Sequence, residues 1–326
     1  MVFEEWVGMS KGKRRNQSLT RAFTAATRRR SLLMILVLAA IASLSLTAQP
    51  KPQPRSERLA LEDMPTAQEI LERSLKSSER NWKLAENYTW RETRIFRKKD
   101  SQGAVKSQES KTYDVTMIDG KEHQRLVMKD GQPLPPDQER KEQQKLDKEV
   151  AEIQKESASE RAGRQAKQEE ERLEDERMYR AIPKAFRFEL LGEDLVGGRT
   201  AWVIQATPRE GFKPFNRQTS WLPKMKGKLW IDKQALIWLK AEVETLDTIS
   251  FGWVLARVGK GSTMHFEQRL INNEVWMPRR TAVDFDARLA IFKKLYGEAE
   301  MLFSDYKKFS ADSRIVSTSV VDGTQQ

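Results

Sequence analysis

Polar and apolar residues change their spacing several times along this chain, and each change marks a different kind of element. Between residues 65 and 86 apolar residues recur every three or four positions, which is typical of an amphipathic helix. Thr66 and Glu69 stand at the spacing of a capping box, which predicts that the helix begins there. The apolar face predicted for this helix consists of Ile70, Leu71, Leu75 and Trp82.

The pattern changes to alternation from Asn87 onward, which indicates β-strands. Residues 87–130 read as long antiparallel strands joined by turns, among them Asp119-Gly120, a strong hairpin signal. Alternation resumes after Pro183 and continues to about residue 309. We expect ten to eleven antiparallel strands, and a sheet of that size must curl. The sequence therefore predicts a mainly β fold with helices, in which a half-open barrel is covered by the N-terminal amphipathic helix.

Two segments interrupt the alternation. Residues 137–181 contain 11 basic and 14 acidic residues and good helix formers throughout, with only short apolar stripes. We interpret this block as a charged helical insertion, either one solvated helix or two helices that turn near residues 157–163. Residues 208–226 contain three prolines and a glycine and are predicted to form an irregular loop.

The N-terminal segment has the layout of a secretion signal. A basic flank precedes a run of 15 apolar residues, Leu32–Leu46, and small residues follow it. This run is shorter than the roughly 20 residues that a spanning helix needs, so we predict a signal over 1–48 and a periplasmic protein. An uncleaved N-terminal membrane anchor is the alternative, and either Met1 or Met9 is a suitable start. The expected order is then a disordered linker at 49–64, one domain at 65–309 and a tail at 310–326.

Charge and composition narrow the classes of function. The formal net charge of +11 includes +6 from residues 1–48, so the remainder carries a modest +5 and does not indicate a nucleic-acid partner. The absence of cysteine excludes disulfides, thiolate metal sites, cysteine nucleophiles and a lipidated N-terminal cysteine. The two histidines have no ligand at metal-binding spacing, and no phosphate-binding loop or nucleophile elbow occurs. We therefore expect no metal, no cofactor and no catalytic residue.

The strands are rich in aromatic residues and methionine. Most of these side chains should form the core, but one helix cannot cover the whole inner surface of so large a sheet. The remainder is predicted to line an apolar binding surface, for which methionine supplies deformable side chains. The candidate ligand-binding residues are Trp90, Trp202, Trp230, Trp238, Phe266, Met277 and Phe285.

Several short segments resemble the LolA/LolB-type lipoprotein-carrier superfamily, which includes outer-membrane lipoprotein-sorting proteins and RseB/MucB-like sensors. The segments are Tyr88-Thr-Trp-Arg-Glu92, Gly227-Lys-Leu-Trp-Ile-Asp232, Lys240-Ala-Glu-Val-Glu244, Phe266-Glu-Gln-Arg269 and Val275-Trp-Met-Pro-Arg-Arg280. The resemblance covers residues 65–130 and 184–309. It implies a half-open barrel with a helical lid that holds lipid acyl chains on its concave face. The charged insertion and the loop at 208–226 depart from the family pattern.

These observations lead to one principal hypothesis and two alternatives. The principal hypothesis is a non-catalytic periplasmic carrier that binds a lipid or lipoprotein acyl chain and contacts the membrane peripherally or transiently. The first alternative is an envelope protein-interaction or stress-sensing module that docks a partner protein through residues 137–181. The second is a cell-envelope hydrolase that uses carboxylate catalysis.

Overall fold

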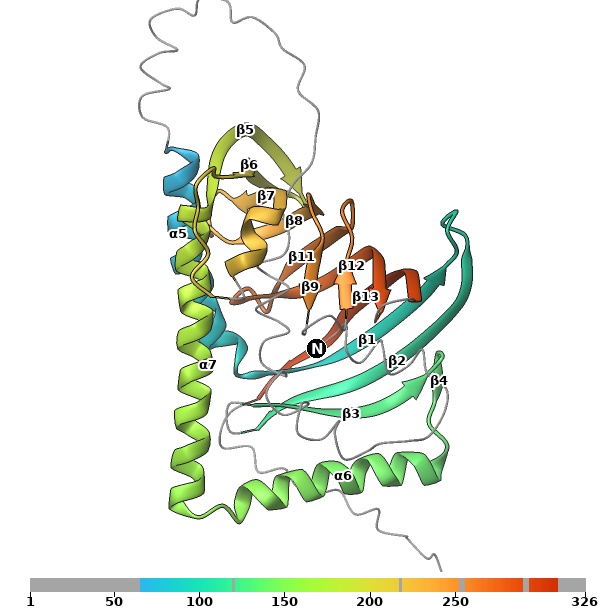
Figure 1. The fold of residues 1–326 in the computed structure, drawn as a ribbon. Helices are drawn as coiled ribbons and strands as arrows, with labels where there is room; N and C mark the ends of the chain where they lie inside the picture. Colours follow the sequence, from blue (N-terminus) through green and yellow to red (C-terminus); the bar gives the residue numbers. More distant parts are fainter. Residues whose placement is uncertain (1–64, 119–120, 217–218, 252–255, 290–292, 310–326) are drawn as a thin grey trace, which may run out of the picture.

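One open antiparallel sheet forms the body of the molecule (Figure 1). The computed structural model describes residues 65–118, 121–216, 219–251, 256–289 and 293–309. The predicted signal, linker and tail lie outside these residues, as does the Asp119-Gly120 turn. No helix among the described residues has the length and apolar character needed to cross a membrane.

The sheet contains thirteen strands, and every strand pair is antiparallel. The strands are β1 (Tyr88–Lys99), β2 (Val105–Ile118), β3 (Lys121–Lys129), β4 (Gln132–Pro133), β5 (Phe186–Val196), β6 (Arg199–Pro208), β7 (Met225–Asp232), β8 (Trp238–Thr245), β9 (Ile249–Phe251), β10 (Ala256–Val258), β11 (Thr263–Ile271), β12 (Val275–Leu289) and β13 (Lys293–Lys308). Their order across the sheet is β4-β3-β2-β1-β13-β12-β11-β8-β7-β6-β5, with β10 paired to β12 and β9 to β10. The sheet is not closed, which confirms the predicted fold class. The count exceeds the expected ten to eleven because β4, β9 and β10 are too short to show alternation.

Alternation gives the sheet two different faces. We call the face that carries the main hydrophobic cluster the inner face; it includes Trp90, Phe266 and Phe303. The opposite, outer face carries ion pairs such as Arg97–Glu298 and Lys240–Glu242. The curved sheet thus has one apolar and one largely charged surface, as expected for a sheet with one face turned to water.

Helix α5 (Ala67–Ala85) covers part of the inner face. The predicted capping box is present, because Thr66 Oγ1 accepts from the Glu69 amide while the Glu69 carboxylate accepts from the Thr66 amide. Ile70 and Leu71 are fully buried, and Leu75 and Trp82 pack half-buried against the same cluster. The helix packs on β5, β7 and β12, so it lies over the part of the sheet distant from β2 and β3.

The charged insertion forms two helices, α6 (Pro136–Gln154) and α7 (Ala158–Ala185), that turn beside Ser157. α6 has no buried residue and passes along β3 (Figure 1). The end of α7 differs from the expectation of a solvated helix, because Met178 and Ile182 are buried in the main cluster. The high charge of the preceding turns concealed these two apolar positions in the sequence.

The segment predicted as a loop at 208–226 also contributes to the core. It holds a short 3-10 helix, η1 (Thr219–Lys224), and the first residues of β7. Trp221 and Leu222 of η1 are buried in the main cluster, and η1 packs against α7. α5, the end of α7 and η1 therefore fill the inner face together.

Candidate functional site

The candidate site is the inner face where β12, β13, β1 and β2 lie side by side. Strand register places one row of inner residues across the sheet, each opposite the next on the neighbouring strand. The row runs Arg94, Met301, Thr281, Phe266, Ala241, Leu229, Ile204 and Leu190. Since neighbouring strands are about 4.8 Å apart, this apolar row crosses roughly 30 Å of sheet and has a cation at its β1 end.

A buried ion pair forms that end of the row. The Arg94 Nε lies 2.5 Å from the Glu92 Oε1, and the two side chains are only 7% and 5% exposed. The Arg94 guanidinium also lies over the ring of Tyr113, 4.6 Å from its centroid. Buried charges are costly unless they are paired and hydrogen-bonded. The Glu92–Arg94 pair is therefore the charged group at the end of this apolar row, and we call it the polar pole of the inner face.

Two buried polar atoms on this face have no hydrogen-bond partner among the described residues. They are the indole Nε1 of Trp90 and the hydroxyl of Thr281. Thr281 lies directly opposite Met301 in the row, and Trp90 precedes Glu92 by two residues on β1. Leaving such groups unsatisfied costs about 1–3 kcal/mol each, so a ligand that carries a hydrogen-bond acceptor would be favoured here.

Tyr306 packs beside this polar pole. Its ring lies 6.3 Å from that of Trp90, and its hydroxyl donates to the Pro278 carbonyl at 2.5 Å. Burial raises the pKa of Tyr306 well above its ordinary value; the nearby Arg269 lowers it, and the negative charge of Glu92 adds to the increase. The phenol thus stays neutral at physiological pH and serves as a hydrogen-bond donor.

Helix α5 is joined to the sheet by polar contacts as well as by its apolar face. The Trp238 indole donates to the Ser74 hydroxyl at 2.9 Å. The Asn81 side-chain amide donates to the Trp276 carbonyl and accepts from the Trp276 amide, both at 2.7 Å. Asn81 therefore bonds to β12 as a neighbouring strand would, which fixes the position of the helix over the sheet.

Most of the predicted ligand-binding residues meet on the inner face. Trp90, Trp202, Trp238, Phe266 and Met277 all belong to the main cluster, together with the helix residues Ile70, Leu71, Leu75 and Trp82. These nine residues thus surround one surface. Its role in ligand binding stays a prediction.

Phe285 and Trp230 do not belong to the main cluster, although alternation from Thr281 along β12 keeps Phe285 on the inner face. Phe285 is buried and stacks on Phe96, with ring centroids 6.2 Å apart. Trp230 belongs to a second cluster with Trp276, and the Lys240 ammonium lies 4.3 Å from its ring centroid. Because its neighbours on β7 join the main cluster, alternation turns Trp230 to the outer face.

Sequence reasoning missed Glu92 and Arg94. They were not singled out within the predicted strand, since charged residues usually face water. The signal was nevertheless present, because they share the alternating positions of Tyr88, Trp90 and Phe96. Two charged residues in phase with large aromatic residues indicate a polar group within an apolar face.

The described residues contain no group of three or more histidine, aspartate or glutamate side chains arranged to hold a metal ion. His123, on β3, is buried, and its Nδ1 lies 2.9 Å from a carboxylate oxygen of Glu149 in α6. His265 is exposed on β11, with Nδ1 3.9 Å from Glu242. The two histidines lie on separate strands and each has its own carboxylate.

No family model matches the sequence, and no curated protein sequence matches it. Among solved structures, a putative outer membrane lipoprotein-sorting protein domain from Vibrio parahaemolyticus is 12% identical, with 74% of this chain and 95% of that chain covered and a TM-score of 0.33. A LolA superfamily protein from Nitrosomonas europaea is 12% identical, with 76% and 95% covered and a TM-score of 0.29. The MucA/MucB complex of Pseudomonas aeruginosa matches at 10% identity, 73% and 99% coverage and a TM-score of 0.19. These are the kinds of protein that the sequence resembles, but at such TM-scores they carry no weight for function.

Proposed function

We propose that this protein is a non-catalytic carrier of the cell envelope that holds an acyl chain, from a lipid or a lipoprotein, against the inner face of its sheet. The observation that supports this most directly is the inner row from Arg94 to Leu190, apolar for most of its length and charged at one end. Such a surface matches an amphiphile with a polar head and a long chain. Each buried CH₂ group contributes about 0.8 kcal/mol, so one acyl chain supplies ample affinity without any reacting group.

The contacts of α5 suggest how such a ligand enters. Only one face of the helix is apolar, and three side-chain hydrogen bonds from Ser74 and Asn81 join it to strands β8 and β12. Breaking those bonds and sliding the apolar face would expose the inner row. In this proposal α5 is the lid, and the unpartnered Trp90 and Thr281 donors meet the polar end of the ligand.

The experiment compares two adjacent residues of β13 that face opposite sides. Met301 is buried in the inner row, whereas Leu302 is 38% exposed on the outer face. The full chain is first examined by native mass spectrometry for co-purified lipid, then stripped and titrated with a fluorescent C16 fatty acid. Met301→Gln should weaken binding about tenfold or more, because it places an amide where the chain lies. Leu302→Gln is the matched control and should bind as the wild type does.

Two results would refute the carrier function. One is the absence both of co-purified lipid and of saturable fatty-acid binding by the folded wild type. The other is an equal loss of binding in the two variants, which would show that the substitutions act through stability. Thermal unfolding of both variants separates this second case from a local effect.

Docking of an envelope protein on residues 137–181 stays a prediction. The burial of Met178 restricts the surface that a partner could reach to α6 and the first turns of α7. Photo-crosslinking from Lys145, an exposed residue of α6, tests it: one specific adduct in cells is expected. An adduct pattern identical to that from an exposed outer-face position would exclude this role.

A further inference from the structure

Cations on the outer face usually lie beside carboxylates. Arg97 pairs with Glu298 at 2.8 Å, Lys226 with Glu244 at 2.8 Å, and Lys240 with Glu242 at 2.7 Å. These pairs are formed by β1, β7, β8 and β13, so opposite charges alternate across the strands. The rim formed by β10, the end of β12 and the start of β13 breaks this order.

Three cations stand directly opposite one another at this rim. Arg257 of β10 is the register partner of Arg288 of β12, and Arg288 is the register partner of Lys294 of β13. The inner residues Ala287 and Leu295 alternate with them, which assigns the three positions to the outer face. Like charges directly opposite each other destabilise a sheet, so this row has a cost in the folded protein that its neighbours avoid.

Arg257 and Lys294 are exposed, and within the described part of the chain neither forms an ion pair. The nearest acidic position in the register is Asp286, which stands opposite Gly259, two pairs along from Arg288. The two described cations of the row therefore leave the rim positive.

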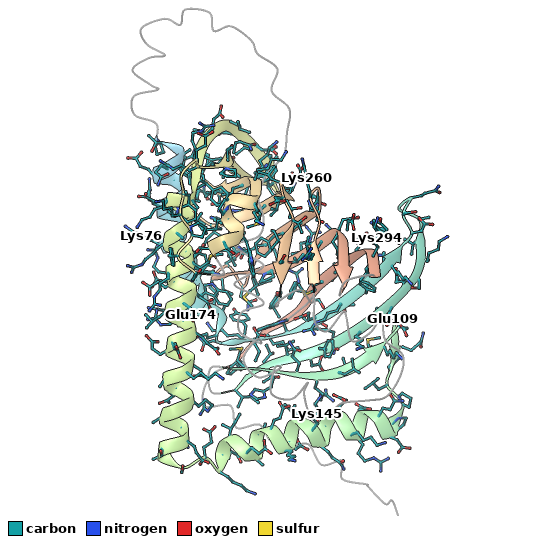
Figure 2. The ribbon with its side chains drawn as sticks, viewed as in Figure 1. Lys76, Glu109, Lys145, Glu174, Lys260 and Lys294 are labelled. Carbon is teal, nitrogen blue, oxygen red and sulfur yellow. The ribbon has the colours of Figure 1, made fainter. Side chains whose placement is uncertain are left out.

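Lys260 extends the positive rim. It follows β10 closely, and Figure 2 shows Lys260 and Lys294 at the same end of the sheet, far from Lys145 on α6. Asp247 lies near enough to Lys260 to interact with its charge, but the ion pair of Asp247 is with Lys224, at 3.2 Å. The rim therefore presents several cations to an external anion.

The composition of the adjoining sequence favours a membrane over other polyanions. The chain connections 252–255 and 290–292 read Gly-Trp-Val-Leu and Ala-Ile-Phe and contain no charged residue. Basic residues next to large apolar ones in the sequence are typical of membrane-surface segments. The proposed surface itself is limited to the described cations.

We propose that Arg257, Lys294 and Lys260 form a docking surface for anionic phospholipid headgroups, with which this rim of the sheet meets a membrane. The proposal extends the proposed function by locating the point of membrane contact, and it rests on charge and register that hold whether or not the inner face binds a lipid. Each cation near an anionic bilayer contributes about fivefold to binding at low salt, and the contribution decreases with ionic strength.

The test measures co-sedimentation of the full chain with vesicles of phosphatidylcholine containing about 30% phosphatidylglycerol, and with pure phosphatidylcholine vesicles. The ratio of the two partition coefficients isolates the charge-dependent part from any apolar insertion of the N-terminal segment. In Arg257→Gln/Lys294→Gln this ratio should fall on the order of twentyfold. Lys145→Gln/Lys148→Gln removes the same charge from α6 and should leave the ratio unchanged.

An equal fall in both double variants would refute the docking surface, because net charge alone would then explain binding. A wild type that shows no preference for anionic vesicles at low salt would refute it as well. Fatty-acid binding, measured on the same samples, should be unaffected in the rim variant. The two proposals can therefore fail independently.

Discussion

Helices α5 and α6 have the same length, 19 residues each, and both lie on the same sheet, yet only one of them belongs to the core. α5 buries Ile70 and Leu71 completely, whereas α6 has no buried residue. Two ion pairs join α6 to β3, His123 with Glu149 at 2.9 Å and Arg125 with Glu139 at 3.9 Å. Helix length therefore does not decide whether a helix belongs to the core. What decides it is a continuous apolar stripe that packs on an apolar face of the sheet.

The largest difference between the two helices should appear when each loses one leucine. Leu71→Ala in α5 removes a fully buried side chain and should lower the free energy of unfolding by about 3 kcal/mol. Leu146→Ala in α6 removes a half-buried one and should cost less than about 1 kcal/mol. Urea unfolding of both variants measures the difference. Equal losses would contradict the distinction between a structural and a solvated helix.

A smaller difference is expected for polar side chains. Asn81→Ala in α5 leaves the backbone amide and carbonyl of Trp276 without their partner, which should cost about 2 kcal/mol. Gln143→Ala in α6 removes only a bond to Asp147 one turn away and should change stability by less than about 0.5 kcal/mol. Chemical denaturation gives both values. If α5 is the lid, Asn81→Ala should also speed fatty-acid dissociation, which stopped-flow fluorescence detects.

The smallest effect concerns pH at the helix starts. Hydrogen bonds from the backbone and the side chain of Thr66 lower the pKa of Glu69 from its ordinary 4.5. A lowered pKa in the folded state stabilises the protein above pH 4.5, and this contribution disappears as pH falls through the lowered pKa. The destabilisation of Glu69→Gln should therefore be measurable at about pH 7 and vanish near pH 2. α6 begins after Pro135 without a side-chain cap, so it has no corresponding contact to remove.

The sequence predicted the fold well where one periodicity governed a segment. Thr66, Glu69 and the helical spacing after them fixed the start and the buried face of α5, and aromatic alternation identified β1. Prediction failed where a second influence overrode the local pattern. Met178 and Ile182 lie in a charged helix whose last turns happen to reach the core, and only tertiary packing reveals that.

The candidate site could be predicted in composition but not in arrangement. Alternation of Leu229 and Ile231 with Trp230 shows that this tryptophan faces outward, so a stricter reading of the strand would have removed it from the set. The pairing of β1 with β13 could not be foreseen, because it joins opposite ends of the domain. Without that pairing, Arg94 and Met301 cannot be recognised as neighbours.

That pairing also determines when the protein can fold. β1–β4 pair in sequence order, and β5–β8 do so too and reach β12 through β11. Among the described strands β13 alone joins the two groups, and the Arg97–Glu298 contact spans 201 positions of sequence. Contacts between such distant residues make folding slow and leave apolar strands exposed meanwhile. A chain that emerges from its N-terminus first has no complete inner face until β13 has followed, so assembly of the site is the last event of folding.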